Sequence, residues 1–196
     1  DRAVRLIVRS QNTKGGWRYH PHSTDADLSV TICQIMALRS AKNAGFYVPK
    51  AVADRCIAYV KRCRDPRGGF RYMDSHGGPA FARTAAGVVA LYSAGLYNGP
   101  EVEDGLRYLM NCKPGNHFLR HDMHYFYGHY YAAQAMWTAG GKYWQEWYPA
   151  IRDDLLNSPR LRPEGSWFDP ICTHYGTAMA CIILQIPNNY LPILQK

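Results

Sequence analysis

An internal repeat is the feature that most constrains how this chain can fold. Four ten-residue segments align without gaps, and the third residues of consecutive segments lie about 50 positions apart. A steady period of this length is typical of stacked supersecondary units, each of which buries its apolar face against the next unit. The third residues are Thr31, Thr84, Tyr130 and Thr177, in segments 29–38, 82–91, 128–137 and 175–184.

The four repeated segments are apolar on nearly all sides, which predicts helices that are buried by their neighbours. Three of them are followed by a glycine, at Gly45, Gly95 and Gly140. Glycine adopts the left-handed conformation past a helix end most easily, so these positions predict helix ends. Amphipathic patterns lie between the repeats, over 2–9, 50–64, 101–112 and 149–157.

This alternation predicts an all-α chain of about four helix pairs, without strands. Pro49, Pro100 and Pro149 lie near the expected starts of three amphipathic helices, where the missing N–H of proline costs nothing. Because amphipathic helices must flank the buried ones, we expect two concentric helical layers bent into an arc or ring.

Composition bounds the chain to one domain, 1–196, or a fragment of a larger one. No apolar run is long enough to predict a transmembrane segment. The net charge is +8, and Lys61, Arg62, Arg64 and Arg67 crowd one helix end. Without a recognisable nucleic-acid-reading module, this cluster predicts a solvated basic face and no nucleic-acid partner.

Six cysteines are present, and none forms a Cys-x-x-Cys pair, which argues against a zinc knuckle. All but Cys172 lie in apolar helical patterns, so we expect buried free thiols, which fit a reducing compartment. The remaining five are Cys33, Cys56, Cys63, Cys112 and Cys181.

Glycine-aromatic loops precede several of the repeated segments. The stretch 11–17 reads Gln-x-x-x-Gly-Gly-Trp and is similar to the glutamine–tryptophan repeat of squalene–hopene cyclases and prenyltransferase β-subunits. Segments 25–41, 83–95 and 175–196 resemble the bacterial prenyltransferase/squalene oxidase repeat proteins, a group common in planctomycetes. The residues that carry the loop motif are Gln11, Gly15, Gly16 and Trp17, then Gly68, Gly69 and Phe70, then Gly165 and Trp167.

The resemblance implies an α/α toroid whose inner helices line a central cavity. Complete toroids of this family have more helix pairs than the four visible here, so we expect that N-terminal repeats are absent. A partner or a second copy of the chain could then close the arc. Within each loop we expect the glycines to reverse the chain, Trp17 and Phe70 to wedge between repeats, and Gln11 to bond the next turn's backbone.

Asp25 and Asp27 precede the first repeated helix and are candidate proton donors. In class II terpenoid cyclases, which this region resembles, the middle Asp of Asp-x-Asp-Asp protonates an alkene. That acid must be held in its protonated form by its neighbours. Here the motif ends in Leu28, so it is incomplete, and the competing interpretation is that Asp27 or Ser29 caps the helix. We also consider that Arg83 pairs with Asp25 or Asp27.

Two groups of residues have metal-binding chemistry, but we predict no metal and no other cofactor. Asp169, Cys172 and His174 are the donor types that hold zinc in prenyltransferases, yet their spacing departs from the family pattern. Loop residues that share no metal are the preferred interpretation. A second group has a spacing that matches no defensible metal motif and comprises His117, His121, Asp122, His124 and His129.

Segment 124–131 is the most unusual stretch, because nearly all of its residues are aromatic or histidine. Rings of this density can line a cavity, stabilise cations or bind apolar chains, or they can form a large aromatic core. The candidate cavity residues are Tyr125, Tyr127, His129 and Tyr130, together with Arg83 and Trp137.

Three functions remain open. The favoured one is a non-catalytic binding or scaffold protein whose aromatic cavity takes an apolar, isoprenoid-like molecule or a protein segment. The alternatives are a class II terpenoid cyclase-like enzyme and a polysaccharide-active toroid enzyme, since this fold hosts both. A carboxylate pair in the cavity would favour sugars. We expect a soluble protein, cytoplasmic or exported.

Overall fold

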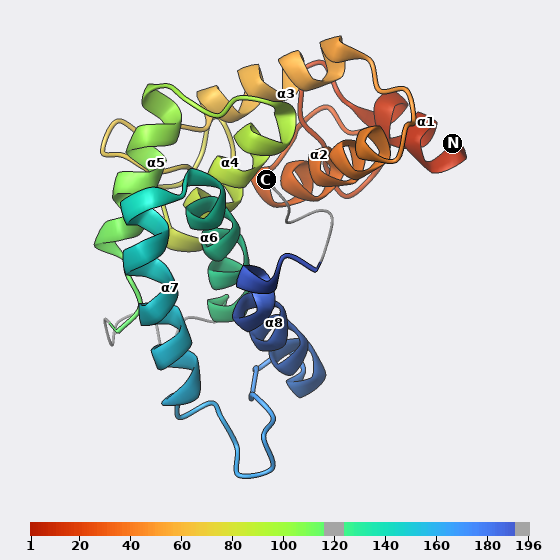
Figure 1. Ribbon diagram of the computed structural model, residues 1–196. Coiled ribbons are helices and arrows are strands. Elements are labelled where there is room, and N and C mark those ends of the chain that lie inside the picture. The colour runs from red at the N-terminus through yellow and green to blue at the C-terminus, as the bar shows by residue number, and fades with distance from the viewer. Residues whose placement is uncertain (116–123, 191–196) are drawn as a thin grey trace.

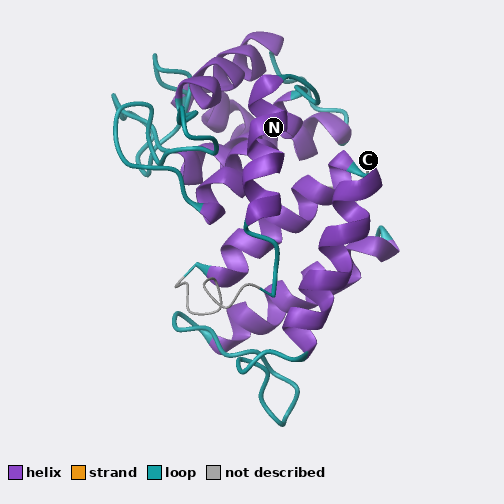
Figure 2. Cartoon of the chain, turned by 90° about the vertical axis from the view of Figure 1, so that its left-hand side faces the viewer, coloured by secondary structure: helices purple, strands orange, loops and turns teal. Residues whose placement is uncertain are grey.

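The computed structural model describes residues 1–115 and 124–190, and these form eight α-helices and one short 3-10 helix. Figure 2 shows helices and loops, and the described residues contain only three isolated β-bridges and no strand. The expectation of an all-α chain is therefore confirmed. The elements are α1 (Arg2–Ser10), α2 (Leu28–Asn43), α3 (Lys50–Arg62), α4 (Phe81–Ala94), α5 (Pro100–Asn111), α6 (Tyr125–Ala139), α7 (Gly141–Leu156), α8 (Thr173–Gln185) and η2 (Ile186–Asn188).

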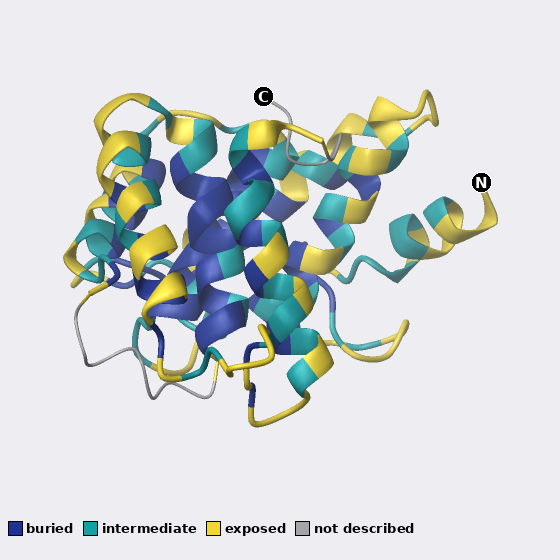
Figure 3. Cartoon of the chain, turned by 60° about the horizontal axis from the view of Figure 1, so that its bottom comes forward, coloured by how far each residue is buried: buried dark blue, intermediate teal, exposed yellow. Residues whose placement is uncertain are grey.

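The even-numbered helices contain the four repeated segments and pack in series. Helix α4 lies against α2 and α6, and α6 lies against α8 (Figure 1). The odd-numbered helices α3, α5 and α7 pack on this series, with α3 and α5 each contacting two even-numbered helices. Helices α4 and α6 are the most deeply buried, and they form the dark centre of Figure 3.

Two glycines inside the buried helices allow this close packing. A Cβ atom at Gly87 of α4 would lie 2.8 Å from the ring of Phe70, and one at Gly128 of α6 would lie 2.6 Å from the ring of Phe81. Both distances are too short for non-bonded carbon atoms. The aromatic residues can therefore press against the helix backbones only because these positions carry no side chain.

Helix α7 differs from the prediction. It begins at Gly141 and not near Pro149, so Pro149 lies inside the helix. Proline removes one backbone hydrogen bond, whose acceptor would be the carbonyl of Gln145. Both residues are exposed, so water can satisfy that carbonyl, while Trp147 and Ile151 continue the buried face of the helix.

The repeated helices are not equally buried, which corrects the prediction for α8. Only Gly176, Ala180 and Ile183 of α8 are buried, and its main neighbours in the described chain are α6 and η2. At the other end, α1 packs on α2 and has no buried residue, although Val4, Ile7 and Val8 are half-buried. The repeats therefore form one core whose two ends are less covered than its centre.

The prediction of buried thiols is right for Cys56 and Cys63 and wrong for three others. Cys33 and Cys181 are exposed although they lie in apolar helical patterns, and Cys112 is half-buried. All six are free, and burial raises the pKa of the Cys63 thiol to about 12. Within the described residues, no helix is long and apolar enough to cross a lipid bilayer.

Candidate ligand-binding site

Three glycine-aromatic loops lead from an odd-numbered helix to the next even-numbered helix with the same hydrogen bonds. In each loop a glycine with positive φ turns the chain, with φ of +92° at Gly15, +89° at Gly68 and +82° at Gly165. Two residues later an aromatic residue donates its backbone N–H to the threonine at the third position of the repeated segment. These bonds join Trp17 N to Thr31 Oγ1 at 3.1 Å, Phe70 N to Thr84 Oγ1 at 3.0 Å and Trp167 N to Thr177 Oγ1 at 2.9 Å.

The aromatic side chains fix each loop to the helices around it. The indole N–H of Trp17 donates to the carbonyl of Ile7 in α1 at 2.8 Å, and that of Trp167 donates to the carbonyl of Leu155 in α7 at 3.1 Å. Phe70 has no indole, and its ring is fully buried. Trp17 and Trp167 thus each join the preceding helix, the loop and the following helix, whereas the Phe70 ring lies against Gly87 of α4 and Gly105 of α5. All three roles are architectural.

Gln11 adds a bond to the next repeat. Its side-chain amide donates to the carbonyl of Gly15 at 2.8 Å and to that of Val52, in the first turn of α3, at 2.9 Å. Gly16 is required by space, because a Cβ there would lie 2.9 Å from Thr31 Oγ1. In the third repeat Tyr130 replaces the threonine, and residues 116–123, which precede it in the sequence, lie outside the described residues.

Asp27 caps helix α2. One carboxylate oxygen accepts from the backbone N–H of Val30 at 2.8 Å, and the other accepts from Arg18 at 2.7 Å. The carboxylate is completely buried, and both of its oxygens accept a hydrogen bond. A proton donor would instead have to carry a proton on one of these oxygens. Asp25 is half-exposed and also lies near Arg18, at 3.5 Å.

The predicted pairing of Arg83 with these aspartates is wrong. Arg18 takes that place because it follows Trp17 directly, and the isolated bridge between Trp17 and Asp27 brings the two sides of the loop together. The neighbouring Asp27 carboxylate raises the pKa of the Arg18 guanidinium. Arg83 has no hydrogen bond or ion pair with the residues that the structure describes.

The candidate zinc residues do not form a shared site. Asp169 is buried and accepts from the backbone N–H of Ile171 at 2.9 Å. Cys172 and His174 are exposed at the start of α8, with Sγ and Nδ1 3.6 Å apart. The backbone N–H of Tyr175 and the His174 ring lower the pKa of the Cys172 thiol. Across 1–115 and 124–190, no group of three or more metal-binding side chains is close enough to hold an ion.

Helix α6 divides the aromatic segment between two faces. Tyr125 and His129 are buried in the core, where the Tyr125 hydroxyl donates to Asp154 of α7 at 2.5 Å. Trp137 packs edge-on against Trp144 of α7, with ring centroids 4.9 Å apart. Three of the six candidate cavity residues therefore pack toward α7 and do not line the cavity described below. Of the histidine group, His117, His121 and Asp122 lie outside the described residues.

A cavity of about 620 Å³ lies at the N-terminal ends of α2, α4 and α6. Of the candidate residues, Tyr127 and Arg83 line it, whereas Tyr130 is half-buried beside Tyr131, with ring centroids 4.9 Å apart. Burial raises the pKa of Tyr127, and its hydroxyl has no hydrogen-bond partner among the described residues. The lining residues are Tyr19, Ser29, Tyr72, Ala80, Ala82, Arg83, His124 and Tyr127.

Two of the lining residues come from the loops and were missed as site residues. The sequence Gly-Gly-aromatic-Arg-Tyr occurs at 15–19 and again at 68–72, and it ends in Tyr19 and Tyr72, whose hydroxyl oxygens are 3.4 Å apart. The guanidinium of Arg18 lies 5.3 Å from the Tyr19 ring and 5.7 Å from the Tyr72 ring. The recurrence of this tyrosine was the sequence signal that could have identified these two site residues. The glycines and the tryptophan of the same motif indicated only an architectural role.

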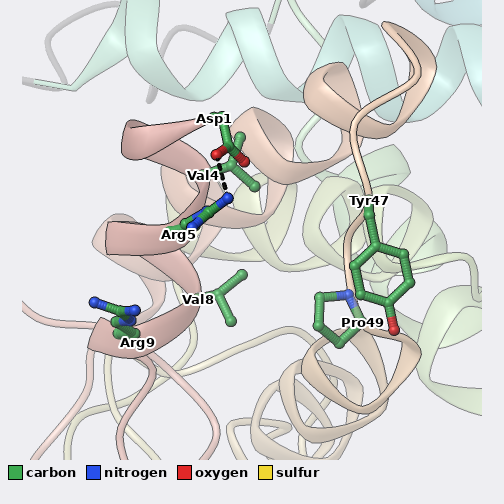
Figure 4. A pocket seen from close by; sticks show the side chains of 7 residues that line it. All are labelled: Asp1, Val4, Arg5, Val8, Arg9, Tyr47 and Pro49. Atoms are coloured by element: carbon green, nitrogen blue, oxygen red, sulfur yellow. Dashed lines mark ion pairs between the residues drawn. The ribbon is translucent and has the colours of Figure 1, made fainter.

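A second, smaller depression of about 360 Å³ lies between α1 and the start of α3. In Figure 4, Val4 and Val8 face Tyr47 and Pro49 across it, and the ion pair of Arg5 with Asp1 lies at its edge. Tyr47 is 85% exposed, so this apolar strip is accessible at the α1 end of the repeat series.

The basic cluster around the end of α3 is neutralised locally. Each of its four residues has an acidic partner, and all four side chains remain partly exposed. Such a surface is solvated and presents no unpaired positive stripe. The pairs are Lys61 with Glu101, Arg62 with Asp74, Arg64 with Asp104 and Arg67 with Asp65.

No protein-family model matches this sequence, and a search among curated proteins finds no similar protein.

Proposed function

We propose that this chain is a non-catalytic binding domain, built as part of an α/α toroid, whose cavity at the ends of α2, α4 and α6 holds a ligand with an apolar body. The ligand is an isoprenoid-like molecule or a protein segment. The observation that carries the proposal is the cavity itself, because rings of Tyr19, Tyr72 and Tyr127 line it and its volume suits a small-molecule ligand.

The toroid proposal rests on the packing order. Helices α2, α4, α6 and α8 contact one another in series while α3, α5 and α7 pack outside them, which is how a two-layered ring would be built. The similarity of the loops to the glutamine–tryptophan repeat supports the same arrangement.

The two enzyme alternatives have less support. A terpenoid cyclase needs a protonated acid, whereas both oxygens of Asp27 accept hydrogen bonds and one of them pairs with Arg18. A glycosidase needs two carboxyl groups facing its substrate, and no aspartate or glutamate is among the described residues that line the cavity.

A second copy of the chain is the partner that we propose for the α1 end. The odd-numbered helices α3 and α5 each contact two even-numbered helices, whereas α1 contacts α2 and keeps no buried residue. Packing a second copy over Val4, Val8 and Tyr47 would bury the apolar strip shown in Figure 4.

Native mass spectrometry of the purified protein, with extraction of any bound molecule, tests the binding function. We expect a bound mass on the natural chain and its loss in Ala80→Phe, which places a ring in the cavity. Ala37→Phe is the matched control, because Ala37 is exposed on α2 and does not line the cavity. Equal retention of the bound molecule by both variants would place it elsewhere and refute the proposal.

A further inference from the structure

Arg83 brings a positive charge to the cavity wall that no residue of the described chain neutralises. It lies in the first turn of α4 and is half-buried. No hydrogen bond or ion pair joins it to residues in 1–115 or 124–190. Partial burial of a charge without a partner is unfavourable, so a group that compensates this charge would be bound there favourably.

The other arginine near the cavity is already neutralised. Arg18 donates to Asp27 at 2.7 Å and lies 3.5 Å from Asp25, and its guanidinium is held beside the Tyr19 and Tyr72 rings. An anion in the cavity therefore gains little from Arg18. Arg83 is the cation that such a ligand would meet along the described wall.

The helix N-termini near Arg83 also carry partial positive charge. Ser29, Ala82 and Tyr127 come from the first turns of α2, α4 and α6, so three helix N-termini adjoin the cavity. The N-terminus of a helix carries a partial positive charge. The Asp27 carboxylate caps α2, but α4 and α6 begin without a capping side-chain bond.

The rest of the wall is suited to an apolar group. Tyr72 and Tyr127 present rings, Ala80 and Ala82 present methyl groups, and the described wall contains no carboxylate. An all-apolar ligand would leave the half-buried Arg83 without a partner in the described chain. A small inorganic anion would leave the tyrosine rings and the alanine methyl groups exposed to water.

We propose that the ligand of this cavity is an amphipathic anion, whose carboxylate or phosphate group pairs with Arg83 while its apolar body lies against the tyrosine rings. This inference rests on the proposed binding function and adds the charge of the ligand to it. The guanidinium of an arginine is planar, and it can donate two parallel hydrogen bonds to a carboxylate or to a phosphate.

The test compares three probes with the same apolar chain and different heads. Decanoate, decyl phosphate and decan-1-ol are titrated into the intact protein by isothermal titration calorimetry at low ionic strength. We expect at least one of the two anions to bind about tenfold or more tightly than the alcohol, because one hydrogen bond to a charged group is enough to strengthen binding by about this factor. Comparison of decanoate with decyl phosphate shows which head group the site prefers.

Arg83→Met identifies the residue responsible. We expect this variant to lose the preference for the anion, with its affinity for decan-1-ol unchanged and its melting temperature equal to or above that of the natural chain. Arg39→Met is the matched control, because Arg39 is also half-buried on an even-numbered helix and has no ion pair in the described chain. It should keep the full preference.

The outcomes separate the two proposals. If decan-1-ol binds as tightly as the anions and Arg83→Met changes nothing, the amphipathic-anion inference is wrong and the binding function stands. If none of the probes binds the natural chain and its purified form carries no ligand, the binding function itself fails. Equal losses in Arg83→Met and Arg39→Met would also overturn the inference, because general loss of charge would then explain the effect.

Discussion

His129 provides the sharpest prediction about stability. Its side chain is fully buried among the rings of Tyr125, Phe81 and Trp147, with centroids 4.5, 4.8 and 6.0 Å away. Neither ring nitrogen has a hydrogen-bond partner among the described residues. Burial lowers the pKa of His129 to about 3, a shift that the Asp154 carboxylate opposes and that Arg160 reinforces. The native protein therefore holds His129 in its neutral form.

The lowered pKa of His129 makes the free energy of unfolding depend on pH, and the size of the pKa shift sets how large that dependence is. The unfolded chain binds a proton on this histidine below its ordinary pKa of about 6.5, whereas the native chain does not until about pH 3. The contribution of neutral His129 to the free energy of unfolding is therefore fully present above pH 6.5, and it is lost as the pH falls toward 3. Each pH unit in that window costs about 1.4 kcal/mol, so lowering the pH from 7.5 to 4.5 removes about 3 kcal/mol.

Urea unfolding followed by circular dichroism at pH 7.5, 6.0 and 4.5 measures this loss. Other groups also titrate, so the quantity to compare is the free energy of unfolding of the natural chain minus that of His129→Phe at each pH. We expect this difference to fall by about 3 kcal/mol between pH 7.5 and 4.5. His22→Gln, at an exposed histidine, is the control and should show no such change. A difference that stays constant for His129→Phe would refute the buried neutral histidine.

Three further predictions concern the loops and the α1 end. Trp17→Ala should cost about 3–5 kcal/mol in urea unfolding, because the indole is buried; a loss within error would contradict its place between α1 and α2. Thr84→Val should cost about 1–3 kcal/mol, because it leaves the buried N–H of Phe70 without an acceptor; an unchanged unfolding midpoint would mean that this bond is unimportant. The natural chain should sediment as a dimer and Val4→Lys as a monomer, while the exposed control Leu6→Lys stays dimeric; a monomeric natural chain would exclude the second copy.

The helices could be predicted from the sequence because the repeat gives equivalent residues the same partners in successive loops and helices. The aligned Thr31, Thr84 and Thr177 are the acceptors for the three loops, so their recurrence had a direct physical cause. The start of α7 could not be predicted in the same way. A proline near the start of a helical pattern favours the first turn, but Pro149 is exposed, and an exposed interior proline costs less than a buried one.

The candidate site was harder to predict than the fold. A run of rings on one helix does not show which face meets the core, and α6 directs Tyr125 and His129 toward α7 while Tyr127 lines the cavity. The partner of Asp27 depended on a loop bridge, which brings Arg18 close, and Arg83 has no carboxylate partner among the described residues. Neither arrangement has a signature in residue spacing.

A crystal structure of the protein grown with decyl phosphate would test the central claim most directly. The account predicts density for the alkyl chain beside Tyr72 and Tyr127 and for the phosphate within hydrogen-bond distance of Arg83. Density for the ligand at another surface, with an empty cavity, would contradict it.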